Sequence, residues 1–118
     1  MTKHGTHIIA DFYGCELSSP IFRDRNKLKK LFSKLIKKHK LKELGSYYHF
    51  FRNHSFTAVI AISESHISVH TWPEDAYVSI DIFACNYSQN NSKNANNLLK
   101  DFRAVFLPKK VIKKVVKR

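Results

Sequence analysis

The residues best suited to chemistry gather in one stretch of the chain, residues 63–74. Ser65 supplies a hydroxyl nucleophile, and His70 supplies an imidazole, the side-chain type that changes protonation near neutral pH. A strand-like apolar run at residues 58–62 comes before the stretch, and a second run at residues 77–85 follows it and ends in a thiol. We therefore expect a nucleophile, a base and a thiol to meet where several strand ends converge.

Other interpretations of this stretch stay open on the residues alone. Ile67 and Val69 alternate with polar residues, which is typical of a half-exposed strand that carries His66 and His70 on its solvent side. A serine hydrolase would favour a Gly-x-Ser-x-Gly elbow, and none surrounds Ser65. Two histidines in a strand could ligate zinc, but no cysteine pair or third ligand stands at metal spacing, so no metal is expected.

Apolar periodicity predicts the elements that must position these groups. Residues 26–40 carry apolar side chains at helical spacing with lysines on the other faces, and Gly45 is interpreted as the stop after this helix. Residues 95–106 predict a second amphipathic helix, which Pro108 ends. The segment 86–97 is rich in Asn and Ser and is interpreted as a loop leading into that helix.

Six strands complete the pattern, with a buried strand at residues 55–63 and an edge strand at residues 111–116. The others are predicted at residues 7–13, at residues 46–51, within the stretch 63–74 and at residues 77–85. The order strand, helix, four strands, helix, strand is typical of an α+β fold. We predict a two-layer sandwich, in which both helices pack on one face of an antiparallel sheet.

Length and composition favour one globular domain spanning residues 1–118. The chain has 118 residues and is 43% hydrophobic, enough for a modest core. No apolar run approaches the ~20 residues of a membrane-spanning helix, and no signal-peptide core is found, so no membrane partner is expected. Two cysteines, Cys15 and Cys85, make no disulfide framework, and a cytoplasmic location is therefore expected.

The formal net charge of +12 is large for a chain of this size. Such a charge is compatible with binding to nucleic acid or an anionic surface, or with a solvated face rich in lysine. The lysines are spread over the predicted helix faces, and no basic ribbon interleaved with aromatic residues is present. We therefore interpret the charge as a solvated face and expect no nucleic-acid partner.

Three segments together resemble one protein family. They are ESHISVHTWPE at residues 64–74, DIFAC at residues 81–85 and HIIADFYGC at residues 7–15. They closely resemble the short prokaryotic S-adenosylmethionine decarboxylases, and the resemblance covers nearly the whole chain. It implies a pyruvoyl-dependent enzyme of spermidine synthesis with the same two-layer architecture, working as a homodimer that binds the substrate as a Schiff base.

The chemistry of such an enzyme explains why a serine would follow Glu64. Decarboxylation of an α-amino acid needs an electron sink, and the chain shows no pyridoxal-phosphate signature. The Ser65 hydroxyl can attack the Glu64 carbonyl and turn the amide into an ester. Loss of the Ser65 α-proton then breaks the ester, and hydrolysis leaves a pyruvoyl group where Ser65 stood. The products are a β chain of residues 1–64 and an α chain of residues 65–118.

The resemblance also assigns roles to other residues. His70 is the candidate base for the elimination, and Thr57 matches the position of a processing serine. Cys85 matches the proton donor that returns a proton to the substrate carbon. Phe51 and Glu74 match positions that bind the nucleoside, Phe51 by stacking on adenine and Glu74 by accepting hydrogen bonds from the ribose hydroxyls.

The chain departs from the family pattern in a few places. Thr57 replaces the usual serine, Asn86 replaces a glycine after Cys85, and the C-terminus is a lysine-rich strand. Two alternatives to S-adenosylmethionine decarboxylation stay open. The same pyruvoyl chemistry can act on arginine or ornithine, or the fold can serve a basic binding protein without enzymatic activity.

Overall fold

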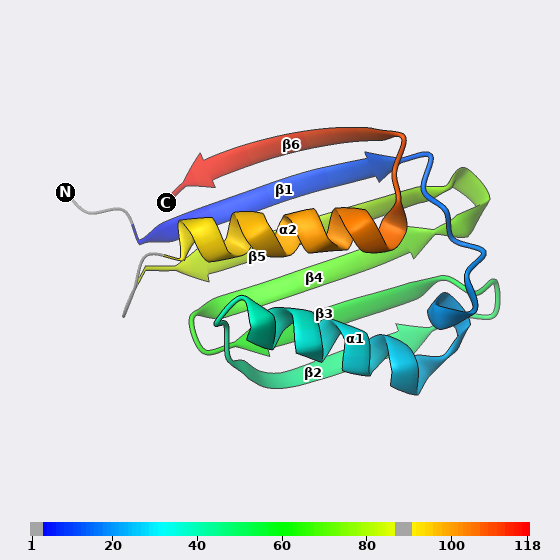
Figure 1. Cartoon of the computed structure of the whole chain (residues 1–118), viewed down its shortest axis with the longest axis horizontal. Helices are drawn as coiled ribbons and strands as arrows, with labels where there is room; N and C mark the ends of the chain where they lie inside the picture. Colours follow the sequence, from blue (N-terminus) through cyan, green and yellow to red (C-terminus); the bar gives the residue numbers. More distant parts are fainter. Residues whose placement is uncertain (1–3, 87–90) are drawn as a thin grey trace.

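The computed structural model describes residues 4–86 and 91–118 of the chain. Within them, six β-strands form one sheet, and two α-helices and two short 3-10 helices make up the rest of the regular structure (Figure 1). In chain order the elements are β1 (Gly5–Tyr13), η1 (Pro20–Arg23), α1 (Arg25–Lys38), β2 (Glu43–Phe50), β3 (Phe56–Ile62), β4 (Ser65–Trp72), η2 (Pro73–Asp75), β5 (Tyr77–Cys85), α2 (Ser92–Phe106) and β6 (Lys110–Lys117).

The sheet has the strand order β2-β3-β4-β5-β1-β6, and every neighbouring pair is antiparallel. Both helices cover the same face, with α1 against β2 and α2 against β1 and β5 (Figure 1). The chain therefore has the predicted α+β architecture, a two-layer sandwich. The lysine-rich strand β6 lies at an edge of the sheet, as predicted.

Alternation along the strands and helical spacing along the helices build one core between the two layers. In β5 the four residues Val78, Ile80, Ile82 and Ala84 are buried and their neighbours are not, which confirms the predicted faces of this strand. The helices bury the facing stripe, consisting of Leu28, Phe32 and Ile36 of α1 and Ala95, Leu98, Leu99, Phe102 and Phe106 of α2. Each large side chain of this kind contributes ~1.5–3 kcal/mol when fully buried.

The end of α1 differs from the prediction that Gly45 stops the helix. Lys40 takes the left-handed conformation with φ of 62° that glycine usually adopts there. The Leu41 N–H donates to the Ile36 carbonyl at 3.1 Å, which caps the last turn, and Leu41 is buried. Gly45 lies instead in β2, where the pairing with β3 shifts register.

Two other expectations about the elements need correction. The proline-led segments that begin at Pro20 and Pro73 form 3-10 helices, where only loops and turns were predicted. Strand β3 is flanked by two strands, yet it is buried on one face only, and Val59 on the other face is 46% exposed. The continuous apolar run of β3 therefore does not reflect burial on both faces, because its second face is apolar and yet exposed.

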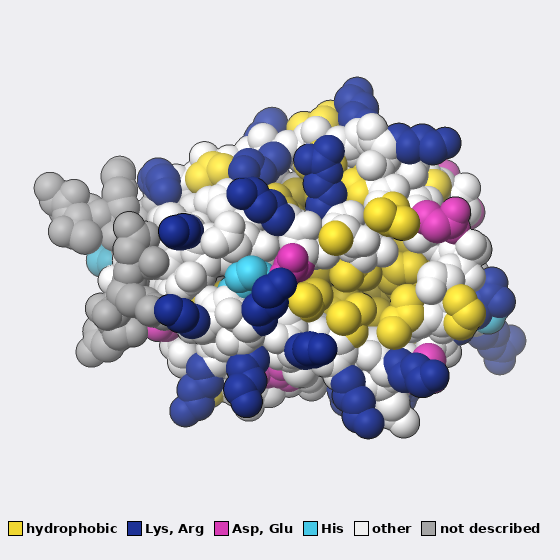
Figure 2. All heavy atoms as spheres, in the orientation of Figure 1, with side chains coloured by type: hydrophobic (Ala, Val, Ile, Leu, Met, Phe, Trp, Pro, Cys, Tyr) yellow, Lys and Arg dark blue, Asp and Glu magenta, His cyan; other side chains and the backbone are white. Residues whose placement is uncertain are grey.

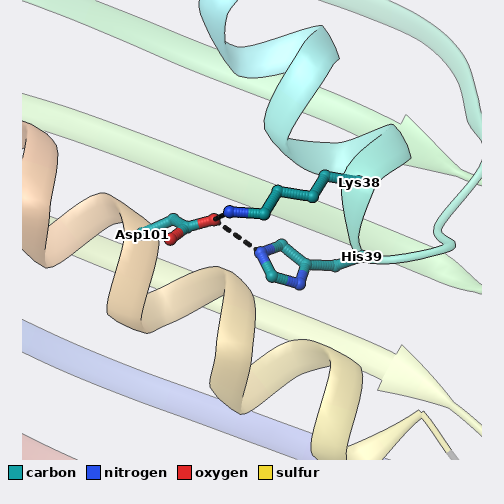
Figure 3. Close-up of polar contacts among 3 residues, drawn as sticks. All are labelled: Lys38, His39 and Asp101. Atoms are coloured by element: carbon teal, nitrogen blue, oxygen red, sulfur yellow. Dashed lines mark hydrogen bonds and ion pairs between the residues drawn. The ribbon is translucent and has the colours of Figure 1, made fainter.

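A polar contact joins the two helices at the surface (Figure 3). Asp101 of α2 accepts a hydrogen bond from Lys38 Nζ at 3.1 Å and lies 2.6 Å from Nε2 of His39, the residue that caps α1. The hydrogen bond with His39, together with Lys38, lowers the pKa of the Asp101 carboxyl. Lys38 and His39 therefore join the C-terminal end of α1 to α2 through one carboxylate.

The two faces of the sandwich differ in character. Figure 2 shows the helix-bearing face, where Lys and Arg side chains are spread widely and do not gather in one groove. The helix-free face of the sheet carries apolar side chains that remain partly in solvent, namely Ile9, Val59, Trp72, Ile112 and Val116. In the described part of the chain, no helix has the length and apolar character to cross a membrane.

Candidate active site

The predicted cleavage site lies in the hairpin between β3 and β4. Ile62 pairs with Ser65, so residues 63–64 form a two-residue loop and Ser65 begins β4. The φ of Ser65 is 145°, a value that is uncommon for a residue with a side chain and costs about 1–3 kcal/mol. The backbone is therefore strained at the residue whose amide bond the predicted cleavage would break.

The residue before the bond, Glu64, is held through both its backbone and its side chain. The Cys85 N–H donates to the Glu64 carbonyl oxygen at 2.8 Å. The side-chain amide of Asn91 donates to the Glu64 carboxylate and, at 2.8 Å, to the Cys85 carbonyl. Asn91 is fully buried, and its own backbone N–H donates to Oδ1 of Asn86 at 2.9 Å. An N–H aimed at a carbonyl oxygen stabilises the negative charge that develops there during nucleophilic attack.

The Ser65 hydroxyl has an imidazole beside it, but this imidazole is not the predicted one. Ser65 Oγ lies 3.1 Å from Nδ1 of His66, an exposed side chain. The His66 ring meets the rings of His7 and Phe83 edge-on, at centroid distances of 6.4 Å and 5.9 Å. Cys85 ends the same strand as Phe83, so the hydroxyl, an imidazole and the thiol residue share one end of the sheet.

A second cluster forms where the turn between β2 and β3 meets β3, β4 and η2. It surrounds a cleft of about 600 Å³ lined by Phe51, Arg52, Asn53, Ser55, Thr57, His70, Thr71, Trp72 and Glu74. Thr57 Oγ1 lies 3.0 Å from Nδ1 of His70, because the two residues are direct partners in the β3–β4 ladder. Glu74 accepts a hydrogen bond of 3.3 Å from Asn53, and Phe51 is 49% exposed. Four of the predicted site residues therefore line one cleft.

The two clusters lie apart within a single chain. Ser65 and His70 are five positions apart on β4, which corresponds to roughly 16 Å along an extended strand. The hairpin that carries Ser65 is at one end of β3 and β4, and the turn beside Phe51 is at the other end (Figure 1). We expected the nucleophile, the base and the thiol to meet. Ser65 and Cys85 do lie at the same end of the sheet, but His70 lies with Thr57 at the opposite end.

Asn91 and Asn53 bond to candidate site residues, and the sequence did not predict either contact. Asn91 sits in an asparagine-rich segment interpreted as a loop, part of which lies outside the described residues, and no local signal separates it from its neighbours. Asn53 belongs to a predicted turn, where asparagine is common for conformational reasons alone. Among residues 4–86 and 91–118, no three His, Cys, Asp or Glu side chains are grouped closely enough to hold a metal ion.

Comparison with known proteins gives a consistent result. The family model described as S-adenosylmethionine decarboxylase matches residues 6–118. An S-adenosylmethionine decarboxylase proenzyme of Persephonella marina is 37% identical over 97% of this chain and 81% of its own length. That of Archaeoglobus fulgidus is 33% identical over 84% and 87%. The crystal structure of adenosylmethionine decarboxylase from Aquifex aeolicus VF5 superposes with a TM-score of 0.85 at 30% identity, covering 100% of this chain and 92% of the other.

These relatives confirm that the fold is that of a decarboxylase, a class of enzyme. The relatives from Persephonella marina and Archaeoglobus fulgidus are named as proenzymes. The chain belongs to the S-adenosylmethionine decarboxylase family. The resemblance noted in three short segments therefore extends over the whole fold, and the predicted α+β sandwich is confirmed by the solved structure.

Proposed function

We propose that this chain is a self-cleaving proenzyme that decarboxylates S-adenosylmethionine, in the cytoplasm, for spermidine synthesis. The observation that carries the proposal is the strained hairpin at Ser65. The carbonyl of the preceding residue, Glu64, accepts a hydrogen bond from the Cys85 N–H. Cleavage removes the constraint on the Ser65 backbone and uses an electrophile that is already polarised. A reducing cytoplasm also keeps both free cysteines as thiols.

Maturation needs two covalent steps on the chain's own residues. In the first, Ser65 Oγ bonds to the Glu64 carbonyl carbon, the Glu64–Ser65 amide bond breaks, and the proton ends on the freed amine. In the second, a base removes the Ser65 α-proton, the bond between Ser65 Cβ and the ester oxygen breaks, and the main-chain carboxylate of Glu64 leaves as the new C-terminus of the β chain. Water then releases ammonia from residue 65, which becomes a pyruvoyl group. We assign the second step to His70, with Thr57 holding its ring through the 3.0 Å contact.

Ser65 fits as the source of this group, since it begins a strand at an accessible end of the sheet. The pyruvoyl group supplies an electron sink for the pair left behind when the carboxylate departs as CO2. Cys85 is the proposed proton donor to the substrate carbon, because it lies at the same strand end. Phe51 is proposed to stack on the adenine, and Glu74 is proposed to accept hydrogen bonds from the ribose hydroxyls.

The separation of the two clusters supports a homodimer with shared sites. The Ser65 end and the Thr57–His70 end lie at opposite ends of the same sheet. If two copies pack their helix-free faces about a two-fold axis that runs across the strands, the Ser65 end of one protomer meets the His70 end of its partner. The exposed apolar side chains of that face, including Val59 and Trp72, would then be covered.

Intact-mass measurement of the purified protein tests self-cleavage. We expect fragments of residues 1–64 and 65–118, and an α fragment that resists Edman degradation because it lacks an amino group. Ser65→Ala should stay a single chain. Cleavage of that variant at the same bond would overturn the mechanism, and a single uncleaved wild-type chain would favour a binding protein without enzymatic activity.

The substrate is tested by CO2 release from S-adenosylmethionine, arginine and ornithine in parallel. We expect S-adenosylmethionine to be preferred, since an exposed aromatic and a carboxylate in one cleft suit a nucleoside. Glu74→Gln should weaken its binding about ten- to a hundredfold, which corresponds to losing one charged hydrogen bond. Release from arginine or ornithine alone would change the substrate and leave the pyruvoyl mechanism standing.

A further inference from the structure

The hydroxyl that starts self-cleavage and the imidazole assigned to the elimination are at different places in the chain. His70 faces Thr57, about five residues along β4 from Ser65. His66 Nδ1 instead lies 3.1 Å from Ser65 Oγ, within hydrogen-bonding distance. With its proton on Nε2, the His66 ring has an acceptor at Nδ1 for the Ser65 hydroxyl proton.

The position of the His66 ring is set by its aromatic neighbours. His7 and Phe83 meet it edge-on, at interplanar angles of 73° and 87°. His7 and Phe83 are themselves stacked, with centroids 5.4 Å apart, and the Arg118 guanidinium lies 4.8 Å from the Phe83 ring centre. Such edge-on contacts stabilise one ring orientation. The imidazole is therefore oriented by a packed group from β1, β5 and the chain end.

The electrophile is prepared at the same place. The Glu64 carbonyl oxygen accepts the Cys85 N–H at 2.8 Å, and the Glu64 carboxylate is held by Asn91. When Ser65 Oγ attacks, the charge that develops on this oxygen is stabilised by the Cys85 N–H. An acceptor for the hydroxyl proton and a donor to the oxyanion thus flank one amide bond.

We propose that His66 is the general base for the first covalent step, the conversion of the Glu64–Ser65 amide into an ester; the proposal rests on the self-cleavage proposed above. Ser65 Oγ gives its proton to His66 Nδ1 and bonds to the Glu64 carbonyl carbon. The carbon–nitrogen bond then breaks, and His66 returns the proton to the freed amine of residue 65. His70 acts afterwards, on the α-proton, so the two histidines serve consecutive steps.

Hydroxylamine separates the two steps, because it cleaves an ester and leaves an amide intact. His70→Ala should form the ester and stop, so that hydroxylamine releases residues 1–64. His66→Ala should remain an amide, resistant to hydroxylamine, and convert at least about 100-fold more slowly than wild type, the size of a general-base contribution. A His66→Ala precursor that converts at the wild-type rate would overturn the role of His66, whereas an uncleaved wild type would overturn self-cleavage itself.

A matched variant distinguishes proton transfer from packing. His66→Phe keeps an aromatic ring beside His7 and Phe83 but has no nitrogen, so it should be as slow as His66→Ala. Added imidazole should accelerate His66→Ala, since the position is exposed, and should leave His66→Phe unchanged. His54→Asn, in the turn between β2 and β3, should cleave like wild type. Normal cleavage by His66→Phe would show that the ring only packs, and would overturn the proposal.

Discussion

Cys85 enters the site through its backbone and through its side chain. Its N–H donates a hydrogen bond to the Glu64 carbonyl at 2.8 Å, and its carbonyl accepts a hydrogen bond from the Asn91 side chain at 2.8 Å. The thiol is the proposed proton donor in turnover. Because substitution of the side chain leaves the N–H in place, maturation and turnover can be separated at this one residue.

Cys85→Ala should keep at least partial self-cleavage and lose productive decarboxylation by roughly 10²- to 10⁴-fold, the usual contribution of a general acid. The measurement is the fraction cleaved by intact mass, followed by the yield of decarboxylated product on the processed protein. Cys15→Ala serves as the control. This buried thiol donates a hydrogen bond to the Phe12 carbonyl and belongs neither to the Ser65 cluster nor to the His70 cluster. Full turnover with clean product from Cys85→Ala would remove the thiol from the mechanism.

At the scale of elements, the start of α2 acts on the hairpin between β3 and β4. Asn91 precedes α2 and places one amide between the Glu64 carboxylate and the Cys85 carbonyl. The helix therefore ties the hairpin to the end of β5. Ladder hydrogen bonds hold β4 and β5 side by side, and the Cys85 N–H joins the hairpin loop to the end of β5. Asn91 adds two side-chain hydrogen bonds at the same place.

Asn91→Ala removes both hydrogen bonds and should slow self-cleavage while costing about 1–3 kcal/mol of stability, as expected for a buried polar contact. The rate is followed by intact mass and the stability by urea unfolding of the uncleaved Ser65→Ala background. Asn94→Ala is the matched control, because the Asn94 side chain donates to Oδ1 of Asn91 at 3.1 Å, whereas Asn91 is the residue bonded to Glu64 and Cys85. Equal cleavage rates for the two variants would argue against positioning by Asn91.

The contact between the helices predicts a dependence of stability on pH. The pKa of Asp101 is lowered in the folded chain, so its stabilising contribution is present above the ordinary value of 3.8 and is lost as pH falls below it. Asp101→Asn should cost ~0.2–1 kcal/mol at pH 7, the range for pairs near the surface, and this difference should shrink below the ordinary pKa. Urea unfolding at pH 7 and near pH 3 measures it, with Asp75→Asn as the control. A difference that does not change with pH would exclude this carboxylate as the source.

The whole molecule is expected to be a dimer whose sites need both chains. The helix-free face is apolar enough to associate, with Val59 46% and Val116 44% exposed. Within one chain the Ser65 end and the His70 end stay apart, because both belong to the same rigid strand. Sedimentation should therefore show a dimer of processed units.

Complementation tests the shared site directly. Ser65→Ala and His70→Ala should each fail to yield mature α chain when produced alone. Produced together, they form mixed dimers in which the Ser65 of one chain meets the His70 of the other, and the His70→Ala chain should then be cleaved. Lack of any rescue in purified mixed dimers would place the action of His70 within its own chain. Production of each variant with a second copy of itself is the control.

Much of the fold and many candidate residues could be predicted from local sequence. The buried faces of β5 and the stripe of α1 follow from side-chain periodicity, which depends only on residue type and on backbone repeat. The segments around Ser65 and Cys85 likewise predicted the family, since their chemistry is carried by neighbouring residues. Thr57, with no local signal of its own, was found through the resemblance to that family.

What only the tertiary structure decided are the contacts between segments distant along the chain. Strand register places Thr57 opposite His70, and it leaves His66 as the imidazole beside Ser65. Packing of α2 brings Asn91 to Glu64, 27 positions away in sequence. Such contacts depend on how strands pair and how helices dock, and those arrangements minimise the free energy of the whole chain, so no single segment encodes them.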